Sequence, residues 1–261
     1  MKNRIICIIL AVIIALSLCA CGVSGGEYKV VKKVADQEYS IGFRAGDNAA
    51  YYVDLVLKEL AYDGTVDNLA RDWFGDSDAV DFQKKKNAAK DIGYVEPRDF
   101  IVGIDLSSYP MCYKSGSSYT GFDVELAKLV CEKLGWTLKI QPIRSEDAYI
   151  ELNSGNIDCA WGGVVLDSES PDYYVLLTYM SNELVIAARS GTSNLLRGKS
   201  LYMDSSQTYL NIINENARIV KNLAQITRID GSTADFFNYL ESGECDYILT
   251  TSSAVSYYNH N

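Results

Sequence analysis

The sequence TGFDVELAKLVCEKLGWTLKIQPIRSEDAYIELNSGNIDCAWGG, residues 120–163, decides the fold class. Its apolar residues recur first at helical spacing, with Asp123 expected as the helix N-cap and Gly135 as the C-terminal stop. Apolar and polar side chains then alternate over residues 136–141, which predicts a strand. A second helix, and a short apolar strand that ends at Gly162, complete the stretch.

Strands that alternate with helices predict crossover connections and a largely parallel sheet, so we expect an α/β fold. Ligands of such sheets bind beyond the carboxyl ends of the strands. Gly162 and Gly163 follow the second strand and therefore mark either a ligand-binding turn or a plain tight turn.

A short unit occurs twice in the sequence. Leu152–Asp158 (LNSGNID) and Leu240–Asp246 (LESGECD) share their spacing, and each lies between a predicted helix and an apolar strand. The repeat predicts two lobes built on one plan.

Composition excludes several classes of protein. The 261 residues are 48% hydrophobic, enough for one large or two small domains, and the net charge of −10 argues against a nucleic-acid partner. The single histidine, His260, excludes most zinc sites and a Ser-His-Asp triad. We expect no metal and no cofactor.

Residues 1–20 are predicted to be a signal peptide, with a basic start and an apolar segment too short for a comfortable membrane span. Residues 18–22, LCACG, resemble the lipobox of bacterial lipoproteins, so Cys21 is the predicted lipidation site and residues 21–26 a short tether. An ordinary secretory signal is the alternative.

Four further cysteines remain, at positions 112, 131, 159 and 245, and none has CxxC spacing. A metal site or redox pair is therefore not expected. Cys131 and Cys159 lie in apolar segments and are predicted to be buried thiols, while the sequence leaves disulfide formation open.

Four motifs together resemble family 3 extracellular solute-binding proteins, the polar amino-acid receptors of ABC importers. They are Gly121–Glu125 (GFDVE), Ser154–Gly163 (SGNIDCAWGG), Tyr179–Asn182 (YMSN) and Leu196–Lys199 (LRGK). The resemblance covers nearly all of the chain after the signal peptide. It implies a two-lobed periplasmic-binding-protein type II fold, with two hinge strands and a ligand between the lobes.

The order of the segments differs from the order that the family implies. Residues 39–75 resemble the end of family members, yet here they precede residues 100–110, which resemble the start. We therefore expect a circularly permuted chain, with residues 76–98 as the connector between the ancestral ends. One lobe is predicted to hold residues 39–75 and 99–181, and the other residues 27–38 and 182–261. A fragment of two tandem receptors is the alternative.

Several amino-acid contacts that the resemblance implies are missing from the sequence. The family's Thr and Arg after the glycine fall on Val165 and Ser170, its ammonium-binding Asp on Thr251, and its stacking aromatic on Ser145. A zwitterionic ligand needs charge partners in a low-dielectric cleft, so this sequence predicts a changed ligand or none.

The predicted ligand-binding residues are those that still match the family or can line a cleft. Asp105 matches a family cleft acid, and the turn before a predicted helix can bind an anion through its N–H groups. The full set is Asp105, Tyr109, Trp161, Gly163, Gln207, Thr208 and Thr251. Tyr109 and Trp161 are equally compatible with core packing.

Three functional classes follow from these observations. The first is a lipid-anchored, extracytoplasmic solute receptor of an ABC importer that binds an amino acid or a related small polar solute. It would be a monomer that works with an ABC permease. The second is a sensor or interaction module that has kept the fold and lost the amino-acid contacts. The third is an enzyme, which the sequence disfavours because it shows no cleft histidine and no paired-carboxylate motif.

Overall fold

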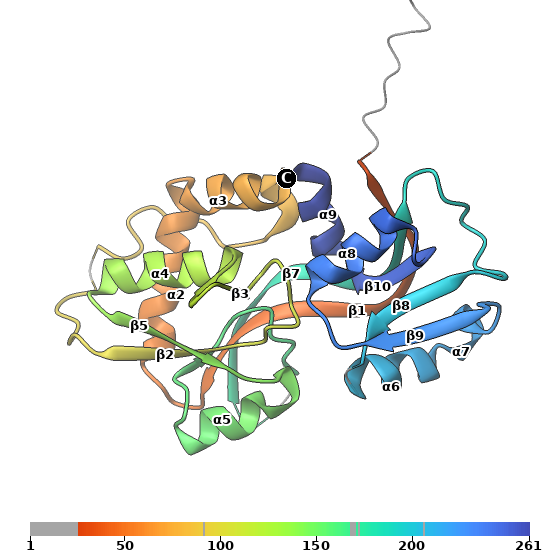
Figure 1. Ribbon diagram of the computed structural model, residues 1–261. Helices are drawn as coiled ribbons and strands as arrows, with labels where there is room; N and C mark the ends of the chain where they lie inside the picture. The colour runs from red at the N-terminus through yellow and green to blue at the C-terminus, as the bar shows by residue number, and fades with distance from the viewer. Residues whose placement is uncertain (1–25, 91, 168–170, 172, 206) are drawn as a thin grey trace, which may run out of the picture.

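The computed structural model describes residues 26–90, 92–167, 171, 173–205 and 207–261. The predicted signal peptide, residues 1–20, and the predicted lipidation site Cys21 lie outside these residues. Two lobes connected by two long strands form the described part of the molecule (Figure 1).

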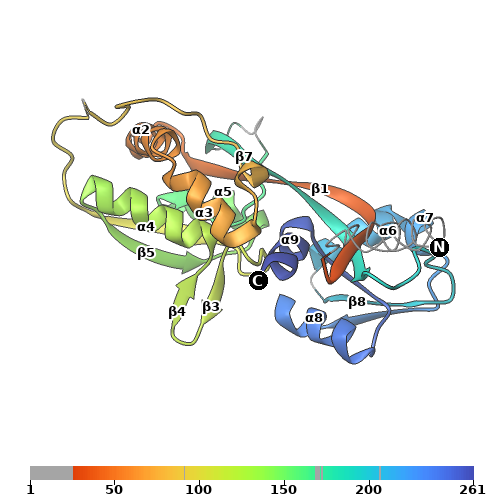
Figure 2. The same cartoon turned by 90° about the horizontal axis from the view of Figure 1, so that it is seen from above.

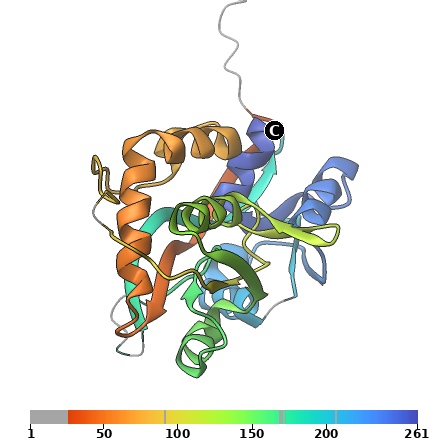
Figure 3. The ribbon, with the colours of Figure 1, turned by 90° about the vertical axis from the view of Figure 1, so that its left-hand side faces the viewer.

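The first lobe carries three parallel strands and four α-helices among the described residues. Its strands are β2 (Asp99–Ile104), β5 (Thr137–Pro142) and β6 (Cys159–Ala160), joined by the 3-10 turn η2 (Ser145–Asp147) and a hairpin of β3 (Tyr113–Ser115) and β4 (Ser118–Thr120). Its helices are α2 (Ala49–Tyr62), α3 (Thr65–Phe74), α4 (Phe122–Leu134) and α5 (Ala148–Ser154), with the 3-10 turn η1 (Ser77–Ala79) after α3. Helices α2, α3 and α4 cover one face of this half of the sheet and α5 the other (Figure 3).

The second lobe repeats this arrangement on a smaller scale. Its parallel strands are β8 (Ser200–Asp204), β9 (Gln225–Ile229) and β10 (Tyr247–Thr251). Helices α8 (Thr233–Ser242) and α9 (Ser252–His260) cover one face, and α6 (Gln207–Glu215) and α7 (Ala217–Val220) cover the other. Helix α9 lies between the two lobes, next to α3 (Figure 2).

Two strands of 17 residues each, β1 (Tyr28–Arg44) and β7 (Tyr173–Arg189), run antiparallel through both lobes. The sheet order is β5-β2-β6-β1-β7-β10-β8-β9. In the first lobe, the parallel strands β5, β2 and β6 are followed by β1 and then by β7. In the second lobe, counted from the other edge, the parallel strands β9, β8 and β10 are followed by β7 and then by β1. The two halves therefore have the same topology, with the two long strands exchanging roles.

The sequence repeat marks equivalent positions in the two halves. The Asp158 carboxylate accepts a hydrogen bond from the backbone N–H of Ile101 at 2.8 Å, and the Asp246 carboxylate accepts one from the N–H of Ser200 at 2.9 Å. Each aspartate directly precedes the parallel strand that comes third in the chain order of its lobe, and its hydrogen bond goes to the first of these strands. The prediction of one plan used twice is confirmed.

Strand β1 is unbroken over its 17 residues, because β7 pairs with it along nearly its whole length. Residues 82–90 of the proposed connector form no helix. The structure corrects the prediction for Asp123. Asp123 is not an N-cap: Gly121 holds that position, and the Asp123 side chain is buried in the first turn of α4.

Candidate functional site

Asp105 follows β2 at the mouth of the space between the lobes, and its carboxylate is held by its own chain. Oδ1 accepts hydrogen bonds from the Ser107 N–H at 3.0 Å and the Ser107 hydroxyl at 2.6 Å. Oδ2 accepts from the Ser145 N–H at 2.9 Å and the Ser145 hydroxyl at 2.6 Å. The carboxylate therefore fixes the loop after β2 to the loop after β5 and keeps a fixed negative charge at the cleft.

Gly163 forms the wall next to Asp105, and a buried carboxylate holds it in place. Its N–H donates to Asp123 Oδ2 at 2.8 Å, and its carbonyl accepts from the Ser108 hydroxyl at 2.7 Å. With φ of +63° and a position 2.1 Å from Ser108 Cβ for any added Cβ, only glycine fits there. The turn at Gly163 thus brings its backbone into close contact with Ser108.

Asp123 also accepts hydrogen bonds from two aromatic side chains. The Tyr179 hydroxyl donates to Oδ2 at 2.5 Å, and Trp161 Nε1 donates to Oδ1 at 3.2 Å. Desolvation raises the pKa of Asp123 to about 7, although these three donors act in the opposite direction. The carboxylate links hinge strand β7 to the turn at Gly163.

Trp161 does not line the cleft, although it was among the predicted ligand-binding residues. Its side chain is fully buried in the core of the first lobe, where its indole N–H serves Asp123. The apolar ring is excluded from the cleft because β6 directs it inward beneath the helices.

The larger cavity between the lobes has a volume of about 390 Å³, within the range of about 300–1,000 Å³ that small-molecule sites occupy. Its walls come from the first lobe, from hinge strand β1 and from helix α6 of the second lobe. Two predicted ligand-binding residues, Asp105 and Gly163, line it, as do Ser145 and Val165, the positions on which missing family contacts fall. The structure thus brings together residues from distant parts of the sequence around one space.

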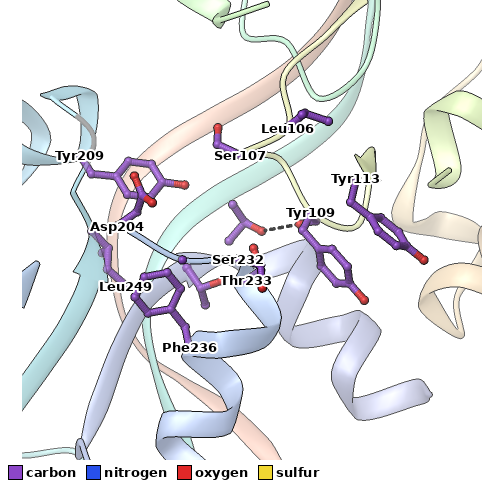
Figure 4. A pocket seen from close by; sticks show the side chains of 13 residues that line it. Leu106, Ser107, Tyr109, Tyr113, Asp204, Tyr209, Ser232, Thr233, Phe236 and Leu249 are labelled. Atoms are coloured by element: carbon purple, nitrogen blue, oxygen red, sulfur yellow. Dashed lines mark hydrogen bonds between the residues drawn. The ribbon is translucent and has the colours of Figure 1, made fainter. Parts of the chain in front are cut away.

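A second, smaller cavity of about 80 Å³ lies at the carboxyl ends of the second lobe's strands (Figure 4). Tyr109 and Thr251 line it, so these two predicted residues lie together but apart from Asp105. Thr251 is buried, caps α9 and lies 3.4 Å from the Tyr109 carbonyl through its hydroxyl. Ser107 and Tyr209 line both cavities and stand between them.

Aromatic rings close the interlobe space beside Tyr109. Its ring centroid lies 4.8 Å from that of Tyr113 in the first lobe, and 5.2 Å and 5.7 Å from those of Tyr257 and Tyr258 in α9. Trp73 of α3 contacts Tyr257 at 5.7 Å. We call these five residues the interlobe aromatic cluster; it packs the two lobes against each other at the α9 end.

The remaining predicted positions carry less information. Gln207 and Thr208, which were predicted to lie in a turn before the helix, are instead the first two residues of α6. Their side chains lie outside the described part of the structure, as does Ser170. The Arg144 side chain is 71% exposed and pairs with Glu146 at 3.2 Å and Asp147 at 2.7 Å. His260 lies beside Gly75 and lines neither cavity.

Comparison with known proteins identifies the family. The sequence model of the bacterial extracellular solute-binding proteins, family 3, matches residues 100–230, half of the chain. The chain belongs to this family. Among curated proteins, the chain is similar to the arginine-binding extracellular protein ArtP of Bacillus subtilis (strain 168), with 28% identity over 109 residues. The alignment covers 40% of this chain and 43% of ArtP, so the chain spans less than half of that relative.

Solved structures of other solute-binding proteins resemble part of this family 3 chain. A substrate-binding protein of an ABC uptake transporter from Streptococcus pneumoniae, with bound histidine, is 28% identical, with a TM-score of 0.43 and coverage of 61% of this chain and 68% of that one. A polar amino-acid ABC transporter substrate-binding protein from Streptococcus thermophilus is 24% identical, with a TM-score of 0.41 and coverage of 59% and 61%.

Tyr39 lies in the cleft of this family 3 protein, although the sequence analysis did not select it. Tyr39 of β1 lines the larger cavity, is 1% exposed, and its hydroxyl has no hydrogen-bond partner within the described structure. Burial raises the pKa of this hydroxyl, so it stays neutral. The sequence signal was only a tyrosine in an apolar strand, which is indistinguishable from a core residue.

Two kinds of feature are absent from the described residues. No helix there has the length and apolar character needed to cross a membrane. No three His, Cys, Asp or Glu side chains gather there in a way that could hold a metal ion. The four cysteines of the described region are buried and free, which confirms the predicted buried thiols at Cys131 and Cys159.

Proposed function

We propose that this chain is the solute-binding component of an ABC importer and closes its lobes on a small polar solute. The observation that carries this proposal is the cavity of about 390 Å³, whose walls come from both lobes and from a hinge strand. Bending of β1 and β7 would change the width of this cavity, which is how hinge proteins enclose ligands. The role is binding rather than catalysis.

The proposal includes the position of the protein in the cell. A lipid on Cys21 would hold the chain at the outer face of the cytoplasmic membrane, next to an ABC permease that accepts the solute. The lipobox-like residues 18–22 support this placement. Globomycin, which blocks the lipoprotein signal peptidase, should make the larger precursor accumulate, while Cys21→Ser should prevent lipid labelling.

The proposal also includes a circularly permuted chain order. The first lobe would hold residues 39–75 and 99–181, the second lobe residues 27–38 and 182–261, and residues 76–98 would be the connector. Strand β1 comes first in the chain. In the symmetric topology, however, it has the place of the strand that would follow α9. Contacts between β1 and α9 support this order.

A ligand-dependent thermal shift tests the receptor function. The full-length chain in detergent is heated while intrinsic tryptophan fluorescence is recorded, in the presence of the twenty amino acids, amines, short peptides and organic acids. A ligand that binds only the folded state raises the melting temperature by mass action, about 2.7 kcal/mol at 100 times Kd. A shift with one compound would support the receptor, whereas none in the whole panel would contradict it.

One observation favours the second candidate, a sensor or interaction module without a solute. The Thr251 hydroxyl lies 3.4 Å from the Tyr109 carbonyl, and the interlobe aromatic cluster packs beside them. At this position the family resemblance implies an ammonium-binding aspartate. A protein with lobes fixed by such packing would give the same small-angle scattering curve with and without every compound of the panel.

A further inference from the structure

The charged side chains that line the two cavities are mostly acidic. Within the described residues they are Asp36, Asp105, Glu146 and Asp204 against the single cation Arg144. A concave site lined by one sign of charge between low-dielectric walls concentrates ions of the opposite sign. The interlobe space therefore favours a cation over an anion.

Arg144 is poorly placed to bind a carboxylate from a solute. Its guanidinium lies 3.2 Å from Glu146 and 2.7 Å from Asp147, and its side chain is 71% exposed. A carboxylate in the cavity would have to compete with two carboxylates of the chain for an exposed cation. Desolvating a carboxylate without a dedicated partner is unfavourable, so an amino acid is a poor fit.

The buried Tyr39 hydroxyl supplies the second, independent observation. It lies in the wall of the larger cavity and has no partner at ordinary hydrogen-bond distance among the described residues, although Ser108 and Asn182 are close enough to lower its pKa. Buried polar atoms nearly always have a partner, so an unpaired one at a cavity wall points to a ligand group. A neutral hydroxyl can accept a hydrogen bond from the N–H of an ammonium or guanidinium group.

We propose that the solute is a small organic amine that carries no carboxylate, and that Tyr39 contacts its charged nitrogen group. This inference rests on the proposed receptor function and narrows its ligand. The fixed carboxylate of Asp105, which lines the same cavity, attracts the cation without leaving its four hydrogen bonds to Ser107 and Ser145.

Pairs of compounds that differ only in the carboxylate test the inference. They are arginine with agmatine, lysine with cadaverine, and histidine with histamine, each titrated against the full-length chain in detergent by calorimetry. We expect at least one amine to bind about 100-fold more tightly than its parent amino acid, because the parent leaves one charge unpaired. An amino acid that binds as well as its amine overturns the inference and leaves the receptor function standing. Binding of none of the six compounds overturns the inference too, and the wider thermal-shift panel then decides the receptor function.

Tyr39→Phe tests the named contact. We expect amine binding to weaken about 5–10-fold, because one hydrogen bond is lost. The melting temperature of the unliganded protein should fall little, since the lost hydroxyl has no partner at ordinary hydrogen-bond distance among the described residues. Tyr149→Phe, at a side chain 46% exposed and outside both cavities, is the matched control and should bind as the unmodified chain does. Equal binding by Tyr39→Phe and Tyr149→Phe overturns the assigned contact.

Discussion

Tyr28 and Asn259 hydrogen-bond to each other twice, although 231 residues separate them in the chain. The Tyr28 N–H donates to Asn259 Oδ1 at 2.8 Å, and Asn259 Nδ2 donates to the Tyr28 carbonyl at 2.9 Å. The first residue of β1 is therefore fixed to the last turn of α9. The side-chain amide of Asn259 thus connects α9 to β1. Elsewhere in the symmetric topology, the backbone itself makes such a connection.

This pairing makes the proposed permutation testable by rearranging the gene. A chain that starts at Asp99, joins Asn261 to Gly26 through a flexible linker of about six residues, and ends at Gly75 should fold to the same structure. We expect its circular dichroism spectrum to match that of the original order. Its melting temperature should be lower, because it lacks Phe82, which is buried and stacks on Tyr179. A control with new ends inside α4 should not fold, because it divides a buried helix. An unfolded product of the first rearrangement would contradict the proposed order.

Asp123 predicts a specific pH dependence of stability. Because burial raises its folded-state pKa to about 7, the folded state binds a proton that the unfolded state releases near pH 4. Its contribution to the free energy of unfolding is thus greatest below about pH 4 and decreases as the pH rises towards about 7. Urea titrations of the unmodified chain and Asp123→Asn from pH 4 to 8 measure it. The stability of the unmodified chain relative to the variant should fall over this range, and a constant difference would refute the assigned titration.

Tyr109→Ala should loosen the contact between the lobes. The ring contacts Tyr113 on one side and Tyr257 and Tyr258 on the other, so its removal deletes packing that spans the cleft. We expect a loss of about 2 kcal/mol in the free energy of unfolding, less than for a fully buried ring. Small-angle scattering should give a larger radius of gyration for this variant. Tyr149→Ala serves as the control, and unchanged scattering for Tyr109→Ala would show that other contacts hold the lobes.

Restoring the family's charged contacts should restore amino-acid binding. The triple variant Val165→Thr, Ser170→Arg and Thr251→Asp adds a guanidinium for a carboxylate and a carboxylate for an ammonium. Aspartate is also a good N-cap, so α9 should keep its start at residue 252. We expect calorimetry to detect arginine or histidine binding only in the triple variant. The double variant without Ser170→Arg is the control, and equal binding by both would argue against the missing cation as the cause.

The sequence predicted the fold where the pattern is local. Periodic apolar residues place α4 and α5, and the repeat at Asp158 and Asp246 predicts the shared plan of the lobes. The hairpin of β3 and β4 was missed because three-residue strands have too few positions for an alternating pattern.

The candidate site was harder to predict because its contacts are not local. Asp123 has the residue type of a cap, but its hydrogen-bond partners lie 38 to 56 residues away, so only folding reveals them. Asp105 was expected in the cleft and lines it. The hydrogen bonds that its carboxylate accepts from Ser107 and Ser145 depend on the geometry of two loops, which the sequence does not reveal. The placement of Trp161 in the core and of Tyr39 in the cavity wall depends on which strand face meets the helices.

The two 17-residue strands β1 and β7 also constrain how this protein can be divided. Ile41 packs in the core of the first lobe while Tyr28 packs in that of the second, and Tyr179 and Val185 do the same along β7. Each core therefore contains side chains from one half of β1 and one half of β7. A gene fragment that encodes one lobe alone would expose unpaired strand edges, which are prone to aggregation. Recombination that exchanges a whole lobe with a homologue must consequently cross over twice, in the middle of two paired strands.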